Sequence, residues 1–131
     1  MIGVDTSVVV RYLVGTPIDQ ARRAAALIDD SEEIGVSVGA LAVCAHVLRT
    51  HYAVEGLDII DSLIGLVQRE NVRVLGLRTD MLVEMLVRAR LMPGRPIPDA
   101  MIVAATLAAD AVPLVTFDRG QARYGVAVRE P

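Results

Sequence analysis

Three aspartates stand where short apolar segments of this chain end or begin. Asp5 follows residues 2–4, Asp118 follows residues 114–117, and Asp99 opens an apolar segment after Pro98. In an open parallel sheet the ligand site lies outside the carboxyl ends of the strands, so acids far apart in sequence can meet there. Carboxylates that meet repel one another unless a hard cation neutralises them. The sequence therefore predicts a Mg²⁺ or Mn²⁺ site at Asp5, Asp99 and Asp118.

Each of these acids also has an ordinary structural explanation. Asp5 is a suitable helix cap, Asp99 is favoured in the first turn of any helix, and Asp118 is a common turn residue. What favours a metal site is that all three acids stand at the ends of separate strands and helices. Nearby hydroxyls are expected to orient the carboxylates by hydrogen bonds, and these belong to Thr6, Ser7 and Thr116.

Composition narrows the class of protein. The 131 residues are 53% hydrophobic and 22% charged, which predicts one folded domain over residues 1–131 with a substantial core. All thirteen basic residues are arginine. The absence of lysine excludes P-loop nucleotide hydrolases and Schiff-base enzymes. A net charge of −3 argues against broad non-specific nucleic-acid binding.

Features of the apolar segments and the single cysteine predict a cytoplasmic protein. The longest uncharged apolar stretch, residues 100–109, is too short to span a bilayer. Asp5 interrupts the start of the chain before an apolar signal region could form. Cys44 has no second cysteine with which to form an internal disulfide.

The elements that would position the acids alternate along the chain. Hydrophobic spacing and turn residues predict strands at 2–4, 34–36, 72–75, 114–116 and 126–128, and helices at 6–14, 17–29, 37–52, 57–68, 79–91 and 98–109. The first strand is expected to be buried on both faces. Strands that alternate with helices predict an α/β domain with a parallel sheet.

These motifs together resemble a PIN domain of the VapC toxin type over the whole chain. The resemblance rests on Asp5-Thr6-Ser7-Val8-Val9, Arg11-Tyr12-Leu13-Val14-Gly15, Ser37 through Arg49, Pro98-Asp99-Ala100-Met101-Ile102 and Thr116-Phe117-Asp118. It implies a three-layer α/β/α sandwich with a central parallel sheet of four to five short strands. It also implies an endoribonuclease that depends on Mg²⁺ or Mn²⁺, is commonly a homodimer, and has a small VapB-like antitoxin as partner. Arg95 then becomes a candidate contact for the RNA phosphate, or alternatively a solvated residue at a loop tip.

One residue departs from the family pattern. The resemblance aligns Val43 with a position that usually carries a glutamate, and no acid occurs between Ser37 and Val54. Cys44 and His46 are the nearest polar candidates, and His46 could share the helical face of Val43, although an exposed or packed histidine is the commoner explanation. We expect weakened catalysis with an intact fold, because a missing supporting carboxylate typically costs about 10–100-fold in metal affinity or activity.

Other functions remain open at this stage. A catalytically inactive PIN module that binds antitoxin or RNA would also explain Val43. The carboxylates alone would suit a DNA nuclease equally well. An aspartyl phosphotransferase with Asp5 as nucleophile is a weaker alternative, because Ser7 occupies the place of its second acid and no lysine is available. The apolar faces of residues 8–14 and 21–28 are candidate antitoxin or dimer surfaces, or parts of the core.

Overall fold

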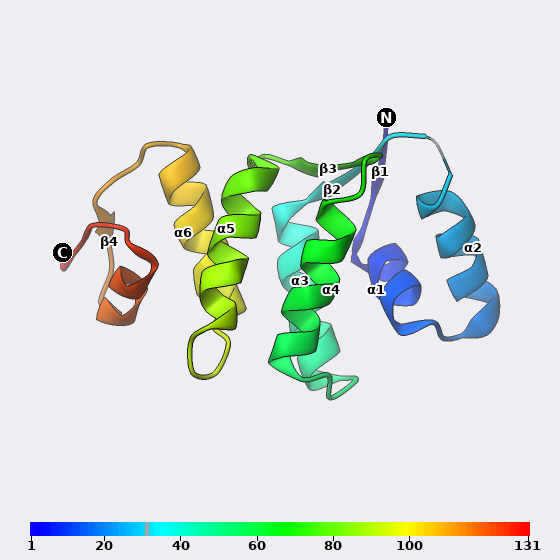
Figure 1. Cartoon of the computed structure of the whole chain (residues 1–131), viewed down its shortest axis with the longest axis horizontal. Coiled ribbons are helices and arrows are strands. Elements are labelled where there is room, and N and C mark those ends of the chain that lie inside the picture. The colour runs from blue at the N-terminus through cyan, green and yellow to red at the C-terminus, as the bar shows by residue number, and fades with distance from the viewer. Residues whose placement is uncertain (31) are drawn as a thin grey trace.

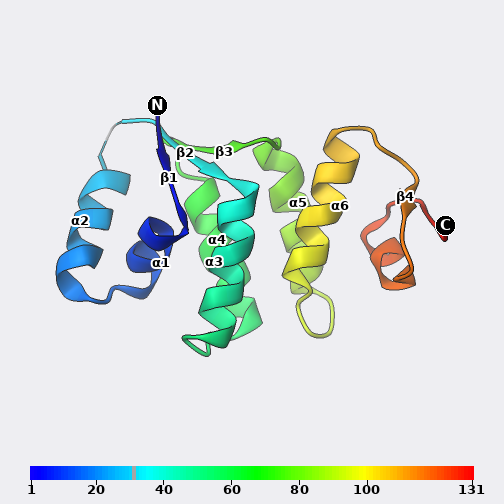
Figure 2. The same cartoon turned by 180° about the vertical axis from the view of Figure 1, so that it is seen from behind.

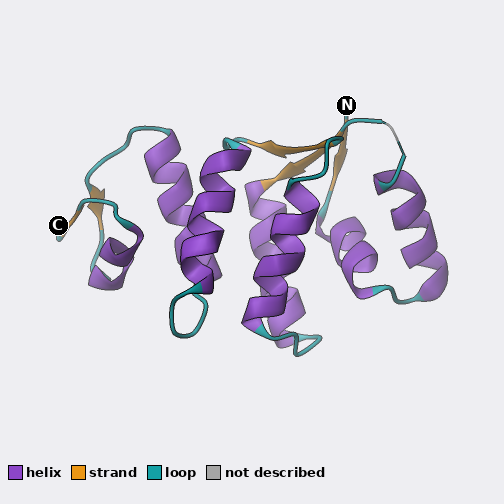
Figure 3. Cartoon of the chain, in the orientation of Figure 1, coloured by secondary structure: helices purple, strands orange, loops and turns teal. Residues whose placement is uncertain are grey.

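The computed structural model describes residues 1–30 and 32–131, and it alternates strands with helices as predicted (Figures 1 and 3). Each predicted element is present, with its ends shifted by no more than two residues. The elements are β1 (Ile2–Val4), α1 (Thr6–Val14), α2 (Ile18–Ile28), β2 (Ile34–Ser37), α3 (Val38–Thr50), α4 (Gly56–Val67), β3 (Val72–Leu75), α5 (Thr79–Arg90), α6 (Ile97–Ala108), β4 (Leu114–Val115), the 3₁₀ helix η1 (Arg119–Tyr124) and β5 (Val128–Arg129).

The first three strands form a parallel sheet in the order β1-β2-β3. Ile34 of the central strand lies opposite Ile2 on one side and Val72 on the other. Parallel neighbours need long crossover connections, and here the α1–α2 and α3–α4 helix pairs supply them. The predicted α/β class with parallel strand pairing is confirmed.

The last two strands do not extend this sheet. The family resemblance implies one central sheet of four to five strands, but β4 pairs in parallel with β5 as a separate two-stranded sheet. Each has only two residues, and η1 returns the chain directly from one to the other. Leu114 and Thr116 donate backbone hydrogen bonds to Ala127 and Arg129 in this small sheet, and α5 and α6 lie between β4 and β1 in Figure 1.

The prediction that β1 is buried on both faces is wrong. Ile2 and Val4 are half-buried and Gly3 is exposed, whereas Ile34 and Val36 of β2 are each 1% exposed. The difference arises because β1 is an edge strand, with a neighbour on one side only among the described residues. Asp5 therefore leaves an accessible edge of the sheet.

The core is aliphatic, as the composition predicts, and most of it lies on the helices. α4 contributes Ile59, Ile60 and Leu63 with no exposed surface, and α5 contributes Leu82 and Leu86 in the same way. Burying each such side chain contributes roughly 1.5–3 kcal/mol to folding. These helices and α6 therefore form a rigid support for the loops at their ends.

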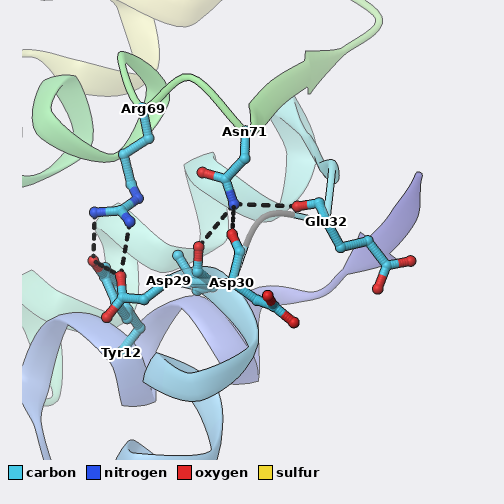
Figure 4. Close-up of polar contacts among 7 residues, drawn as sticks. Tyr12, Asp29, Asp30, Glu32, Arg69 and Asn71 are labelled. Carbon is cyan, nitrogen blue, oxygen red and sulfur yellow. Dashed lines mark hydrogen bonds and ion pairs between the residues drawn. The ribbon is translucent and has the colours of Figure 1, made fainter.

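A polar junction joins the end of α2 to the start of β3 (Figure 4). Arg69 pairs with Asp29 at 2.8 Å and donates to the Tyr12 hydroxyl at 3.3 Å. The side-chain amide of Asn71 donates to three backbone carbonyls, those of Ile28, Asp30 and Glu32. Asn71 thus ties the start of β3 to the backbone of Ile28, Asp30 and Glu32.

Candidate functional site

Asp5 caps the N-terminus of α1. Its Oδ1 accepts hydrogen bonds from the Ser7 hydroxyl at 2.6 Å, the Ser7 amide at 3.0 Å and the Val8 amide at 3.3 Å. These bonds favour the ionised carboxylate, and the pKa of Asp5 is lowered, chiefly by the Ser7 hydroxyl. Its Oδ2 accepts no hydrogen bond from any residue that the structure describes. Asp5 is therefore an anchored carboxylate with one accessible oxygen.

The two hydroxyls beside Asp5 have different partners. Ser7 contacts the carboxylate directly, whereas the Thr6 hydroxyl donates to the backbone carbonyl of Ala40 at 3.0 Å. Ala40 lies in the first turn of α3, where Ser37 caps the helix by accepting from the Ala40 amide. Thr6 therefore fixes α1 against α3, and it makes no hydrogen bond to Asp5.

Asp118 caps η1 at the opposite end of the molecule. Its Oδ1 accepts from the Gly120 amide at 2.9 Å, and its own amide donates to the Thr116 hydroxyl at 2.9 Å. Thr116 thus holds the backbone of Asp118 and makes no bond to the carboxylate. As with Asp5, one carboxylate oxygen accepts no hydrogen bond within the described part of the chain.

Asp99 lies half-buried in the first turn of α6 and contacts η1. Its Oδ1 accepts from the side-chain amide of Gln121 at 3.3 Å. The neighbouring Tyr124 is fully buried and donates its hydroxyl to the Pro96 carbonyl at 2.8 Å. Burial, followed by the charge of Asp99, raises the pKa of Tyr124 to about 12, so its phenol stays protonated. Asp99 and Asp118 therefore both contact or begin the same short helix.

Sequence reasoning missed Gln121. It is only 6% exposed, and its amide connects η1 to Asp99. Glutamine is usually solvated, and nothing in its immediate sequence distinguishes it from a surface residue. Its position three residues after the turn-forming Asp118 is the one signal that could have suggested a role.

The structure does not gather the three aspartates around one point. Figure 2 shows α1, which follows Asp5, on one side of α3 and α6 on the other, with the β4–β5 segment beyond α6. Among residues 1–30 and 32–131, no group of three or more His, Cys, Asp or Glu is placed to hold a metal ion. In the positions that they occupy in this structure, Asp5, Asp99 and Asp118 do not fit a single three-carboxylate metal centre.

Val43 lies on the exposed surface of α3. Ala40, Val43 and Val47 share one helical face by their spacing, and Ala40 is bonded to Thr6. The Val43 side chain is 52% exposed, so a longer charged side chain at this position would reach solvent. Position 43 is about one helical turn along α3 from Ala40, whose carbonyl accepts the hydrogen bond from Thr6.

Arg95 is held by its own turn. It has a positive φ of 45°, donates from Nη1 to the Met92 carbonyl at 2.6 Å, and accepts at its carbonyl from Arg49 at 3.1 Å. An open cavity of about 700 Å³ lies beside it, and Glu55 and Asp58 also line this cavity. The guanidinium therefore stands in surroundings of mixed charge.

Comparison with known proteins identifies the family. A family model described as the PIN domain matches residues 2–127, a range that contains all three aspartates. No curated protein matches the sequence. PIN domains are generally nucleases that act on nucleic acid with the help of divalent metal ions. None of the helices formed by the described residues is long and apolar enough to cross a membrane.

Proposed function

Because this chain belongs to the PIN-domain family, we propose that it is an endoribonuclease of the VapC toxin type. The single observation that carries the proposal is the family match over residues 2–127, which includes Asp5, Asp99 and Asp118 within their motifs. Each of these acids keeps one oxygen without a hydrogen bond from the described residues, as a ligand or catalytic group requires.

The proposed cofactor is Mg²⁺ or Mn²⁺, with the three aspartates as candidate ligands. When bound, a divalent ion supplies positive charge to a phosphate and lowers the pKa of its bound water. Mg²⁺ usually keeps several waters and takes only one or two protein carboxylates, so fewer than three of these acids suffice to bind an ion. The lowered pKa of Asp5 keeps that carboxylate charged at neutral pH.

The proposed partners follow from the same toxin assignment. They are an RNA substrate, a VapB-like antitoxin and a second copy of this chain, acting together in the cytoplasm. A cavity of about 670 Å³ between α1 and α2 supports an antitoxin or dimer contact there. Its apolar part comes from Val8, Ala24 and Leu27, and Arg11 and Arg23 provide positive charge beside it.

A catalytically inactive PIN module that binds RNA or antitoxin is the second candidate. Val43 favours it, because the family pattern usually has a glutamate at this position and this chain has no acid there. The separation of the three aspartates in the described structure favours it as well.

Cleavage of a labelled RNA across a Mn²⁺ and Mg²⁺ titration separates the two candidates. We expect slow, metal-dependent cleavage that falls by at least about tenfold in Asp5→Asn. Asp19→Asn is the matched control, because Asp19 is an exposed acid on α2 outside the three acidic motifs. Absence of cleavage at every ion concentration, with RNA or antitoxin binding retained, would support the binding module instead.

A further inference from the structure

A cavity of about 620 Å³ opens beside Asp5, between α1 and the end of α3. Its walls include Asp5, Val10 and Arg11 from the start of the chain, and Val47, His51 and Tyr52 from the end of α3 and just after it. Ligand sites are commonly cavities of roughly 300–1,000 Å³ with an apolar surface and a few placed polar groups. Val10 and Val47 supply the apolar part here, so the cavity has the size and composition of a site for one nucleotide unit.

Arg11 is held in position at this cavity. Its Nε donates to Oε1 of Gln20 at 2.7 Å, and its Nη1 donates to the Tyr52 hydroxyl at 3.1 Å. Its Nη2 has no partner among the residues that the structure describes. A half-buried guanidinium fixed on two sides, with a free nitrogen, is well suited to bind a phosphate oxygen.

Two rings also line the cavity, and one of them belongs to Tyr52, whose hydroxyl accepts the hydrogen bond from Arg11. The centroids of His51 and Tyr52 lie 5.0 Å apart with an interplanar angle of 74°, so each ring limits the motion of the other. His51 is exposed and Tyr52 is half-buried. Proteins that bind single strands stack bases on aromatic rings beside a positively charged track for the backbone. Arg11 and these two rings provide both features.

We propose that this cavity is a nucleotide subsite for single-stranded RNA next to Asp5. Arg11 binds a backbone phosphate, and the ring pair of His51 and Tyr52 stacks against a base. The assignment rests on the proposed function, because RNA as the polymer comes from it. An RNA strand bound at this subsite would have its phosphodiester backbone next to Oδ2, the Asp5 oxygen that accepts no hydrogen bond from the described residues.

The direct test measures binding while cleavage is prevented. In EDTA, the anisotropy of a fluorescein-labelled single-stranded RNA of mixed sequence gives the Kd without any metal-dependent reaction. Arg11→Gln and His51→Ala should each raise the Kd by about fivefold or more. Arg11→Gln should also reduce the slope of log Kd against log salt by about 0.7, the value for one phosphate contact on a single strand.

Two matched variants control for loss of charge or of a ring elsewhere. Arg22→Gln removes an exposed arginine from α2, and His46→Ala removes an exposed histidine from α3, neither of which lines the cavity. Both should leave the Kd and the salt slope unchanged. If they weaken binding as much as Arg11→Gln and His51→Ala do, the subsite is overturned.

A second measurement uses the unaltered protein and so does not depend on the folding of a variant. Photocrosslinking with RNA that contains 4-thiouridine, followed by peptide mapping, should place adducts on His51 or Tyr52. Adducts confined to other segments would overturn the subsite. So would tighter binding of a DNA strand through the same residues, or no binding by the wild type up to about 100 µM RNA, the weak limit of non-specific binding.

These outcomes separate the subsite from the proposed function. RNA binding that depends on Arg11 and His51, without any cleavage, supports the subsite and contradicts the nuclease. Cleavage by the wild type, with variants that bind as the wild type does, supports the nuclease and contradicts the subsite.

Discussion

The Ser7 hydroxyl donates to Oδ1 of Asp5 at 2.6 Å, the shortest of the three hydrogen bonds that this carboxylate accepts. This bond is the largest cause of the lowered pKa of Asp5. Ser7→Ala should therefore raise the Asp5 pKa toward its ordinary value of about 3.9. A ¹³C NMR titration of the carboxyl carbon measures it, and Asp61, whose pKa Arg90 lowers, serves as the reference in the same spectra. An Asp5 pKa that is the same in Ser7→Ala and in the wild type would show that the Ser7 hydroxyl does not lower it.

The same bond has a consequence for acid stability. A carboxyl whose pKa is lowered by folding stabilises the folded state at pH values above its unfolded pKa. That contribution disappears as the pH falls through the lowered, folded pKa. The Tm difference between wild type and Ser7→Ala should therefore be present at about pH 6 and shrink below about pH 4. A Tm difference between wild type and Ser7→Ala that grows as the pH falls would show that Ser7 does not stabilise the fold through the ionised carboxylate of Asp5.

Replacing Asp5 separates its capping role from its chemical role. Asparagine caps helices about as well as aspartate does, so Asp5→Asn should keep the wild-type Tm. Asp5→Ala loses the acceptor for Ser7 and Val8 and should lower the Tm by about 4 °C. Both should lose RNA cleavage if the charge of Asp5 is needed. Cleavage retained by Asp5→Asn would mean that Asp5 is a helix cap alone.

Cys44 should be inert in the folded protein. Its side chain is fully buried on α3, and burial raises the pKa of its thiol to about 11. Because the thiolate is the reactive form, a disulfide reagent at about pH 8 should modify it only after denaturant is added. Equal rates with and without denaturant would show that α3 is not packed as described.

The local elements were predictable because their signals are local. Gly15 ends α1 with a φ of 81°, and Ser37 begins α3 through a hydrogen bond to the Ala40 amide. Leu82, Met85, Leu86 and Ala89 follow one another on α5 at helical spacing, and all four are buried. Such features depend on neighbours a few residues away, which the sequence displays directly.

Strand pairing and the meeting of distant residues were not predictable in the same way. The pattern Leu114–Val115 indicates a strand but does not say which strand it pairs with, and in the structure it pairs with β5. The predicted meeting of Asp5, Asp99 and Asp118 depended on a single sheet that included β1 and β4. Gln121 was missed because its burial arises from the packing of η1 on α6, which its residue type does not show.

The central claim is that this PIN domain has a weakened metal-dependent nuclease site in which Val43 stands where an acid would help. The Val43 side chain is 52% exposed on α3, so a glutamate can be introduced there without burying its charge. The measurement is the rate of Mn²⁺-dependent RNA cleavage by Val43→Glu. Val43→Gln controls for size, and Val87→Glu controls for a new acid on an exposed valine of α5.

We expect Val43→Glu to cleave RNA about 10–100-fold faster than the wild type, and both controls to match the wild type. A Val43→Glu rate equal to that of the two controls, with all variants folded, would contradict the account.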